Sequence, residues 1–266
     1  LVNNTTASYN TAFGDRALHA NTTGVSNVGI GHYALHATTT GGANTAIGTN
    51  ASDTNTTGSS NTVVGYEALT TSTTASNNVA MGRSSLFSCT TGSYNTAVGK
   101  SSANSITTGE ENVAVGYYAG NQSEVIQLTT QTNRIAMGSK SITNAYIKVA
   151  WTVTSDQRDK ADITDFTHGL DYINELRPVN YVWDERSNYA DGISDGSKKK
   201  DLPQLGFLAQ EIEAVETSLG ITNNCVVDKE DVDNLKITET KLIPILVNAI
   251  QELSTQNAAL AARLTT

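Results

Sequence analysis

The chain has 266 residues, of which 17 are Lys or Arg and 26 are Asp or Glu, and its formal net charge is −9. This length predicts one or two domains, and the negative charge argues against nucleic acid as a partner, because binding to a duplex requires a basic surface that displaces counterions. Since Cys89 and Cys225 are the only cysteines, we expect no disulfide framework and no zinc site built from cysteine. We also expect no cofactor and no bound metal.

The charge is unevenly distributed, and this division predicts two domains. Residues 1–154 carry six positive and six negative side chains, whereas residues 155–266 carry eleven and twenty. The chain does not begin with methionine, so we expect it to be part of a longer protein. It contains no run of about 18 apolar residues and no signal-peptide pattern, which predicts a soluble protein with no membrane partner.

One strict 17-residue period runs through the first half of the chain. The period is carried by an asparagine, by a glycine four residues later, and by a Thr-Thr-Gly turn in which Ala75 once replaces the glycine. The asparagines are Asn10, Asn27, Asn44, Asn61, Asn78, Asn95 and Asn112; the first glycines are Gly14, Gly31, Gly48, Gly65, Gly82, Gly99 and Gly116; the turn glycines are Gly24, Gly41, Gly58, Gly92 and Gly109.

This period predicts a β-solenoid, because equivalent residues form ladders only when every coil has the same length. Glycine allows a positive φ at a corner, and asparagine side chains can hydrogen-bond to the next coil. Two short apolar clusters in each unit favour two short strands. The apolar content of one coil is small compared with the cost of ordering it, about 1–2 kcal/mol per residue, so we expect three copies to pool their apolar residues around one axis.

The sequences NTAVG, NTAIG and NVAVG resemble the head repeats of trimeric autotransporter adhesins and of related phage fibre shafts, over residues 10 to about 120. The resemblance implies an all-β shaft over residues 1–120, a trimeric β-roll or β-prism. The adhesin repeats are shorter, which leaves open whether each chain coils by itself or three chains wind together.

Aromatic and histidine side chains are the candidate binding groups of the shaft. His19 and His36 hold the same place in adjacent units and should stack, either as a solvated pair or as part of a metal or anion site on a threefold axis. His32 and His36 have helical zinc spacing, but this stretch does not resemble a helix. Tyrosines suited to stacking on sugars are Tyr33, Tyr66, Tyr94, Tyr117 and Tyr118.

Residues 121–154 form a connector in which the period fails. The sequence from Arg134 to Gly138 echoes the repeat, but Gly138 arrives 22 residues after Gly116 instead of 17. We expect an insertion at about 121–130 followed by a last, imperfect coil. Residues 145–153 are rich in β-branched and aromatic side chains, which predicts a strand leading into the next domain.

The second half contains three motifs in order: SDQRDKADITDF from Ser155, LPQLGFLAQEIEAV from Leu202 and KLIPILVNAIQEL from Lys241. Together they resemble the intramolecular chaperone domain of phage tailspikes, fibres and endosialidases, classed as peptidase S74. The resemblance implies an α+β domain over residues 155–266 that trimerises, assists folding of the preceding shaft and cuts itself off. The family pattern S-D-x-R-x-K maps onto Ser155 and Lys160, and the bond to be cut is Thr154–Ser155. Family members often have Asn-Ile where this chain has Asp162-Ile163.

A serine hydroxyl becomes a nucleophile when a neighbouring base accepts its proton, and a lysine can serve once burial lowers its pKa. Five residues turn about 500° in an α-helix, so Ser155 and Lys160 must meet through a turn of the chain or across a subunit boundary. A pair formed across subunits would make cleavage wait for assembly. Asp156, Arg158 and Asp159 are candidates for tuning Lys160 or holding the turn. An exposed polar turn without chemistry is the alternative.

The remaining elements are typical of a small trimerising domain. Residues 167–176 should form a helix that Arg177-Pro178 ends. Residues 181–183 should form a strand, and residues 184–200 an exposed loop or hairpin. A second helix should start at Gly206, with Leu208, Ile212 and Val215 on one face. Lys198 to Lys200 are interpreted as a solvated turn, with a phosphate contact as the alternative.

A heptad seam occupies the helix expected over residues 240–264. It predicts a three-stranded coiled coil, with an amphipathic helix packed on its own domain as the alternative. The seam residues are Ile243, Leu246, Ile250, Leu253, Asn257, Leu260 and Leu264.

We therefore expect the distal fragment of a bacteriophage tail fibre. It should be a homotrimer that is assembled in the host cytoplasm and carried on the virion. Its shaft should bind a receptor on the host cell surface, and a glycan is one candidate for that receptor. One alternative is a bacterial trimeric adhesin head. Another is a polysaccharide depolymerase, which needs paired carboxylates. The carboxylates of the shaft are sparse: Asp15, Asp53, Glu67, Glu110, Glu111 and Glu124.

Overall fold

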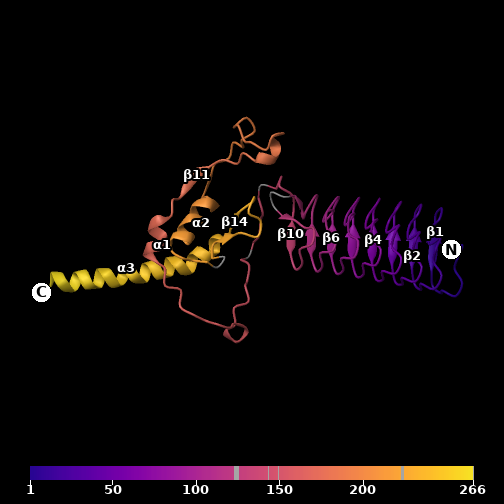
Figure 1. Cartoon of the computed structure of the whole chain (residues 1–266), viewed down its shortest axis with the longest axis horizontal. Helices are drawn as coiled ribbons and strands as arrows, with labels where there is room; N and C mark the ends of the chain where they lie inside the picture. The colour runs from indigo at the N-terminus through magenta and orange to yellow at the C-terminus, as the bar shows by residue number, and fades with distance from the viewer. Residues whose placement is uncertain (123–125, 143, 149, 223–224, 266) are drawn as a thin grey trace. The chain divides into compact units, whose positions relative to one another are not determined.

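The computed structural model describes residues 1–122, 126–142, 144–148, 150–222 and 225–265. The chain divides into two compact units, Leu1–Lys148 and Val149–Thr266, coloured from indigo to pink and from pink to yellow in Figure 1. Two residues named in the predictions lie outside the described residues: Val149, part of the strand expected over 145–153, and Glu124, one of the carboxylates of the shaft. Within the described ranges, no helix is both long and apolar enough to cross a bilayer.

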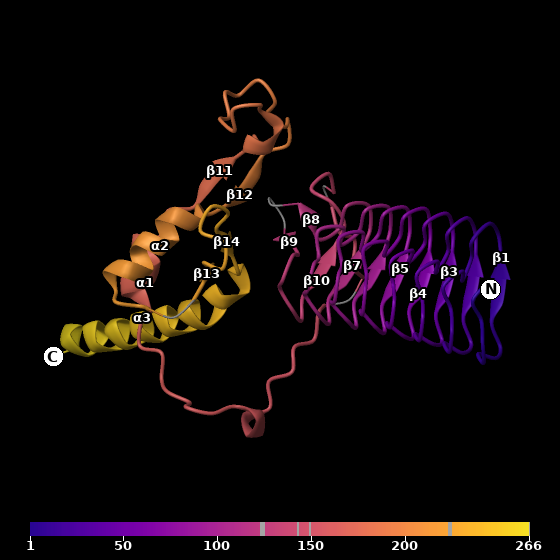
Figure 2. The same ribbon diagram turned by 45° about the vertical axis from the view of Figure 1, so that its right-hand side comes forward.

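The first unit is a β-solenoid in which each coil adds one strand to a parallel sheet of eight strands. Strands pair in steps of 17 residues, so that Ala46 faces Val63 and Val63 faces Ala80, and Figure 2 shows them stacked side by side. The chain therefore coils by itself. The strands are β1 (Thr11–Phe13), β2 (Val28–Ile30), β3 (Thr45–Ile47), β4 (Thr62–Val64), β5 (Val79–Met81), β6 (Thr96–Val98), β7 (Val113–Val115) and β10 (Ile135–Met137).

Each coil has one strand, so the prediction of two strands per unit was wrong. The second apolar cluster, such as Ala17-Leu18, lies in turns. Leu18, Leu35 and Leu69 have φ values of 50°, 52° and 48°, and this left-handed conformation cannot continue a strand. These leucines are nevertheless fully buried, because the turn points each side chain into the core.

The predicted asparagine ladder is confirmed. Asn61 donates from its backbone and its side-chain nitrogen to Asn44 Oδ1, both at 3.0 Å, and also donates to the carbonyl of Ala75. Asn78 donates in the same way to Asn61 Oδ1. Each side chain thus ties its own coil to the coils on either side, which explains why the period tolerates no change in length.

Glycine is required where successive corners stack. Gly65 has φ +142°, and a Cβ added there would lie 2.5 Å from the carbonyl oxygen of Gly82. The same close approach recurs at each equivalent glycine from Gly14 to Gly99. Backbone packs directly on backbone at this corner, so no larger residue fits.

The solenoid closes its core within one chain. Leucine, alanine and valine side chains from successive coils form one buried cluster that includes Leu18, Val63, Leu86 and Ile106. Stacking coils within one chain therefore buries these residues, and forming this core does not require three copies.

The insertion and the last coil of the connector are confirmed. A short hairpin, β8 (Asn121–Gln122) and β9 (Ile126–Gln127), interrupts the period, and β10 then pairs with β7 across 22 residues. By contrast, none of the described residues of 145–153 is in a strand. Tyr146, Trp151 and Val153 are 93%, 75% and 81% exposed, and among the described residues no strand lies beside this segment to pair with it.

The second unit is a small α+β domain. Its helices are α1 (Leu170–Glu175), α2 (Ala209–Ser218) and α3 (Leu242–Leu264). Its strands form two hairpins, β11 (Val179–Tyr181) with β12 (Gln204–Gly206) and β13 (Val227–Asp228) with β14 (Lys236–Ile237). Short 3-10 turns, η1 (Gln157–Asp159), η2 (Arg186–Asn188) and η3 (Glu239–Lys241), complete it.

The core of this domain joins the three helices, with Tyr172 from α1, Ile212 from α2 and Ile245 from α3 fully or almost fully buried. The predicted helix at Gly206 begins later, at Ala209, because Gly206 pairs in β12. The predicted strand at 181–183 is displaced to β11 for the same reason: its partner β12 ends the ladder at Tyr181.

Candidate functional site

A single 3-10 turn, η1, shapes the segment that begins at Ser155. Asp156 caps this turn by accepting the backbone N–H of Arg158 at 2.9 Å. The same carboxylate forms an ion pair with the Arg158 guanidinium at 2.6 Å, and this hydrogen bond is the main reason that the pKa of Asp156 lies below its ordinary value. Asp156 and Arg158 thus hold the turn from both its backbone and its side chains.

The turn brings Ser155 and Lys160 together. Lys160 Nζ donates to Ser155 Oγ at 2.6 Å, although five residues separate them. Two predicted site residues are therefore in contact within one chain, through a turn and not along a helix. In this arrangement the lysine nitrogen lies where it can accept the proton of the serine hydroxyl, once the lysine itself is neutral.

Both side chains of this pair are exposed in the single chain. Thr154, the residue before the bond predicted to be cut, is exposed as well. A lysine loses its proton more readily when burial penalises the charged ammonium. General-base chemistry requires the neutral form of a lysine, and the single chain leaves this turn uncovered.

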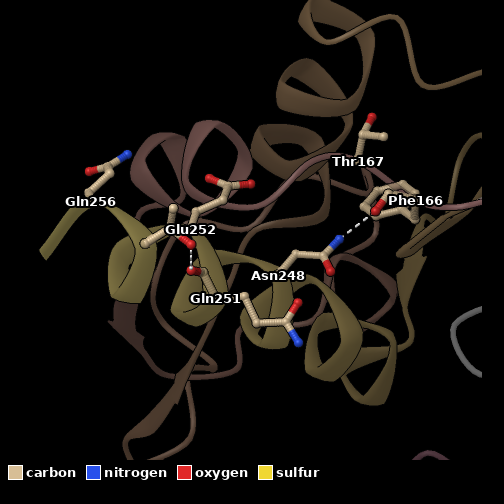
Figure 3. A pocket seen from close by; sticks show the side chains of 7 residues that line it. Phe166, Thr167, Asn248, Gln251, Glu252 and Gln256 are labelled. Carbon is tan, nitrogen blue, oxygen red and sulfur yellow. Dashed lines mark hydrogen bonds between the residues drawn. The ribbon is translucent and has the colours of Figure 1, made fainter. Parts of the chain in front are cut away.

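The chain after the turn is tied to α3, a contact that the sequence did not suggest. Asn248 donates to the carbonyl of Phe166, and Glu252 accepts the backbone N–H of Leu170 at 3.0 Å, at the start of α1. Figure 3 shows the hydrogen bond between Asn248 and Phe166, which both line an open groove of about 500 Å³. Its lining residues do not include Ser155 or Lys160, and all except Phe166 have polar side chains: Phe166, Thr167, Asn248, Gln251, Glu252, Thr255 and Gln256.

A second feature that the sequence did not suggest is a buried carboxylate. Glu216 on α2 is fully buried; its Oε1 accepts from the Tyr172 hydroxyl at 3.2 Å and from the Val226 N–H at 2.7 Å. Burial, followed by the charge of Glu216, raises the pKa of Tyr172. Since this pair links α1, α2 and the segment before β13, its role is to hold the domain together.

The α3 helix has two apolar stripes. Leu242, Ile245 and Ala249 are buried against the rest of the domain. The predicted heptad seam lies on a different face and is exposed: the exposed fractions are 59% for Ile243, 43% for Leu246, 66% for Ile250, 48% for Leu253, 53% for Leu260 and 80% for Leu264. Packing on its own domain therefore leaves the seam available to another helix.

The predicted stacking of His19 on His36 is confirmed, with ring centroids 5.4 Å apart. Asp53 lies 3.4 Å from His36, and Tyr33 packs on both His32 and His36. Among the described residues, no group of three or more His, Cys, Asp or Glu side chains is arranged to hold a metal ion. Of the predicted sugar-stacking tyrosines, the most exposed are Tyr66, Tyr94 and Tyr117.

The triple lysine lies in the loop between β11 and β12. Lys198 donates to the carbonyl of Asn188 and sits over the Tyr189 ring, and Lys200 forms an ion pair with Glu185 at 2.6 Å. Two of these ammonium groups thus organise the loop itself, and Lys199 is exposed.

Residues 155–221 match the family Peptidase_S74, described as the chaperone of endosialidase. No curated protein and no solved structure matches the chain. The match begins at Ser155, two residues before η1, and the family name denotes a peptidase as well as a chaperone. A β-solenoid with 17-residue repeats that precedes such a segment is consistent with a tail-fibre shaft and its folding domain.

Proposed function

We propose that this chain is the distal part of a bacteriophage tail fibre whose C-terminal domain forms a homotrimer, assists folding of the solenoid shaft and then releases itself by cutting Thr154–Ser155. The observation that carries the proposal is the 2.6 Å contact between Lys160 Nζ and Ser155 Oγ, located where the match to a chaperone and peptidase family begins.

In the proposed reaction, neutral Lys160 accepts the proton of Ser155 Oγ as this oxygen attacks the carbonyl carbon of Thr154. The peptide C–N bond breaks, the proton passes from Lys160 to the departing Ser155 amine, and an ester joins Thr154 to Ser155 Oγ. Water then hydrolyses the ester, leaving a carboxylate on Thr154 and restoring the serine hydroxyl. Asp156 and Arg158 position the pair by holding the turn.

The exposed seam of α3 supports the trimer. An isolated globular domain seldom leaves a row of large apolar side chains in water, and alternating steps of three and four residues match the spacing of a coiled coil. Asn257 within the seam would select register and strand number at some cost in stability. The same seam fits a bacterial trimeric adhesin, but the family match at Ser155 favours the tail fibre.

The proposed role of the shaft is attachment to a host surface, with the exposed Tyr66, Tyr94 and Tyr117 as candidate contacts with a glycan. A depolymerase is less well supported, because Asp15 and Asp53 are engaged with histidines and the shaft has few other carboxylates.

Mass spectrometry of the purified chain tests the cleavage. We expect two fragments that meet at Thr154–Ser155, and a single intact chain for Ser155→Ala and for Lys160→Ala. Lys160→Arg keeps the positive charge but cannot act as the base, so it should also remain intact, whereas Lys199→Ala, which removes an exposed lysine of the same domain, should be cut normally. An uncut wild-type trimer would refute the protease assignment.

A further inference from the structure

The outward face of the solenoid sheet carries an uninterrupted apolar column. In each three-residue strand the middle residue faces the core, so the first and third side chains point outward. The third residue of each strand is apolar. We call these residues the third-position column: Phe13, Ile30, Ile47, Val64, Met81, Val98, Val115 and Met137.

The neighbouring first-position column is also uncharged. It consists of threonine, valine and isoleucine: Thr11, Val28, Thr45, Thr62, Val79, Thr96, Val113 and Ile135. Charged side chains of the shaft lie beyond the ends of the strands, at corners such as Asp15, Arg16, Arg83 and Lys100. The two columns themselves therefore present no charge to a partner, and the charged side chains lie at the rim of the face.

The column is substantially exposed in the single chain. Exposed fractions are 75% at Phe13, 42% at Met81, 37% at Val98 and 66% at Met137. Together the column forms a patch of roughly 600 Å² or more, at or above the largest patch on a typical monomer and close to the share of one partner in a stable interface.

We propose that this face is where the shafts of two further copies pack in the assembled protein, so that the third-position side chains of three chains meet in layers around a common axis. The inference rests on the proposed trimer and adds the surface through which the shafts associate. The solenoid core is already buried within each chain. In the proposed packing, the outward-facing column is buried as well, against the columns of the other two chains.

The length and spacing of the column argue for a second copy as the occupant. Eight rungs at about 4.8 Å extend over roughly 34 Å. A partner that fits all of them must repeat at the same interval over the same length, and another copy of this shaft meets that condition in register. Parallel association is also what a helix seam at the C-terminal end of each chain would enforce.

Cysteine cross-linking in the full chain tests the proposal. The background is Ser155→Ala, which keeps the two parts joined, with Cys225→Ser; Cys89 is kept because it is fully buried. Val98→Cys places a thiol on the column, and Thr91→Cys, also exposed, places one on the Thr-Thr-Gly turn as the matched control. Light scattering establishes the oligomeric state of each variant first.

The expected result is a trimer in which mild oxidation or a short bismaleimide converts up to about two thirds of the Val98→Cys chains to covalent dimers, because three thiols around one axis form one pair and leave one chain unlinked. Thr91→Cys should stay monomeric on denaturing gels. A trimer that cross-links at neither position, or equally at both, would overturn this inference and leave the proposed function standing. A chain that is monomeric in solution would overturn both.

Register is tested by mixing differently sized chains that carry Ile47→Cys or Val98→Cys and refolding them together. The two positions are three coils apart, about 14 Å, beyond the reach of a disulfide. Cross-links should join like positions only, and efficient joining of unlike positions would refute the in-register packing.

Discussion

The asparagine ladder permits a quantitative test of what stabilises the shaft. In Asn61→Ala the side chain that joins three coils is lost. The buried N–H of Asn78 then loses the Asn61 Oδ1 that accepts it at 3.0 Å, and the carbonyl of Ala75 loses its donor at 2.9 Å. Asn44 Oδ1 retains the backbone N–H of residue 61, so this oxygen remains satisfied.

Leaving one buried donor and one buried acceptor unsatisfied costs about 1–3 kcal/mol each, so Asn61→Ala should lower the free energy of unfolding by about 2–6 kcal/mol. Asn10 is on the terminal rung, is only partly buried, and makes two side-chain hydrogen bonds. Water can replace some of these, so Asn10→Ala should cost about 1–2 kcal/mol. The exposed Thr57→Ala should change stability by about 0.5 kcal/mol or less.

Urea denaturation of the Ser155→Ala chain, followed by far-UV circular dichroism, measures these differences at a fixed protein concentration. The predicted order is a large loss for Asn61→Ala, a smaller loss for Asn10→Ala and almost none for Thr57→Ala. If Asn61→Ala unfolded at the same urea concentration as Thr57→Ala, the ladder would not be the element that ties successive coils together.

Three further predictions follow from the same structure. Gly65→Ala should destabilise the shaft by about 3 kcal/mol in the same urea assay, because its Cβ would meet the Gly82 carbonyl; an unchanged midpoint would contradict this. Ile250→Asp should convert the trimer to monomers in sedimentation experiments, whereas Gln251→Asp, next to it and exposed, should not; equal behaviour would remove the seam from the interface. Burial raises the pKa of the Cys89 thiol to about 12 from the ordinary 9.0, so its contribution to stability is present below pH 9 and is lost as pH rises towards 12; a thiol reagent at pH 8 should label it only on unfolding, and rapid labelling of the folded shaft would refute its burial.

The solenoid was predictable because its period reflects interactions between identical positions. Asn44 binds Asn27 and Asn61, so a change in the length of any coil would break two contacts. The conformation of Leu18 was not predictable, since leucine rarely adopts a φ of 50° and only the stacking of turns enforces it. The strand expected over 145–153 rested on local propensity, which forms no strand without a partner.

The sequence predicted the residues of the candidate site, but not the long-range contacts that hold the domain around it. The spacing of Ser155, Asp156, Arg158 and Lys160 is a local pattern, and a turn held by Asp156 brings the first and last of these together. The contact of Glu216 with Tyr172 spans 44 residues, and that of Asn248 with Phe166 spans 82. Polar pairs so distant in sequence leave no periodic signal, so they emerge only from the folded domain.

The α3 helix shows why one pattern supported two interpretations that are compatible with each other. Leu242, Ile245 and Ala249 anchor the first turns to the domain, whereas the seam that includes Leu246 and Ile250 faces solvent. A helix with only one apolar stripe could bury that stripe either in the core of its own domain or against a partner, but not in both. With two stripes, the folded domain holds the start of the helix in place and presents the seam already ordered. The entropy of ordering the first turns of that helix is therefore offset during folding of the single chain and does not oppose association.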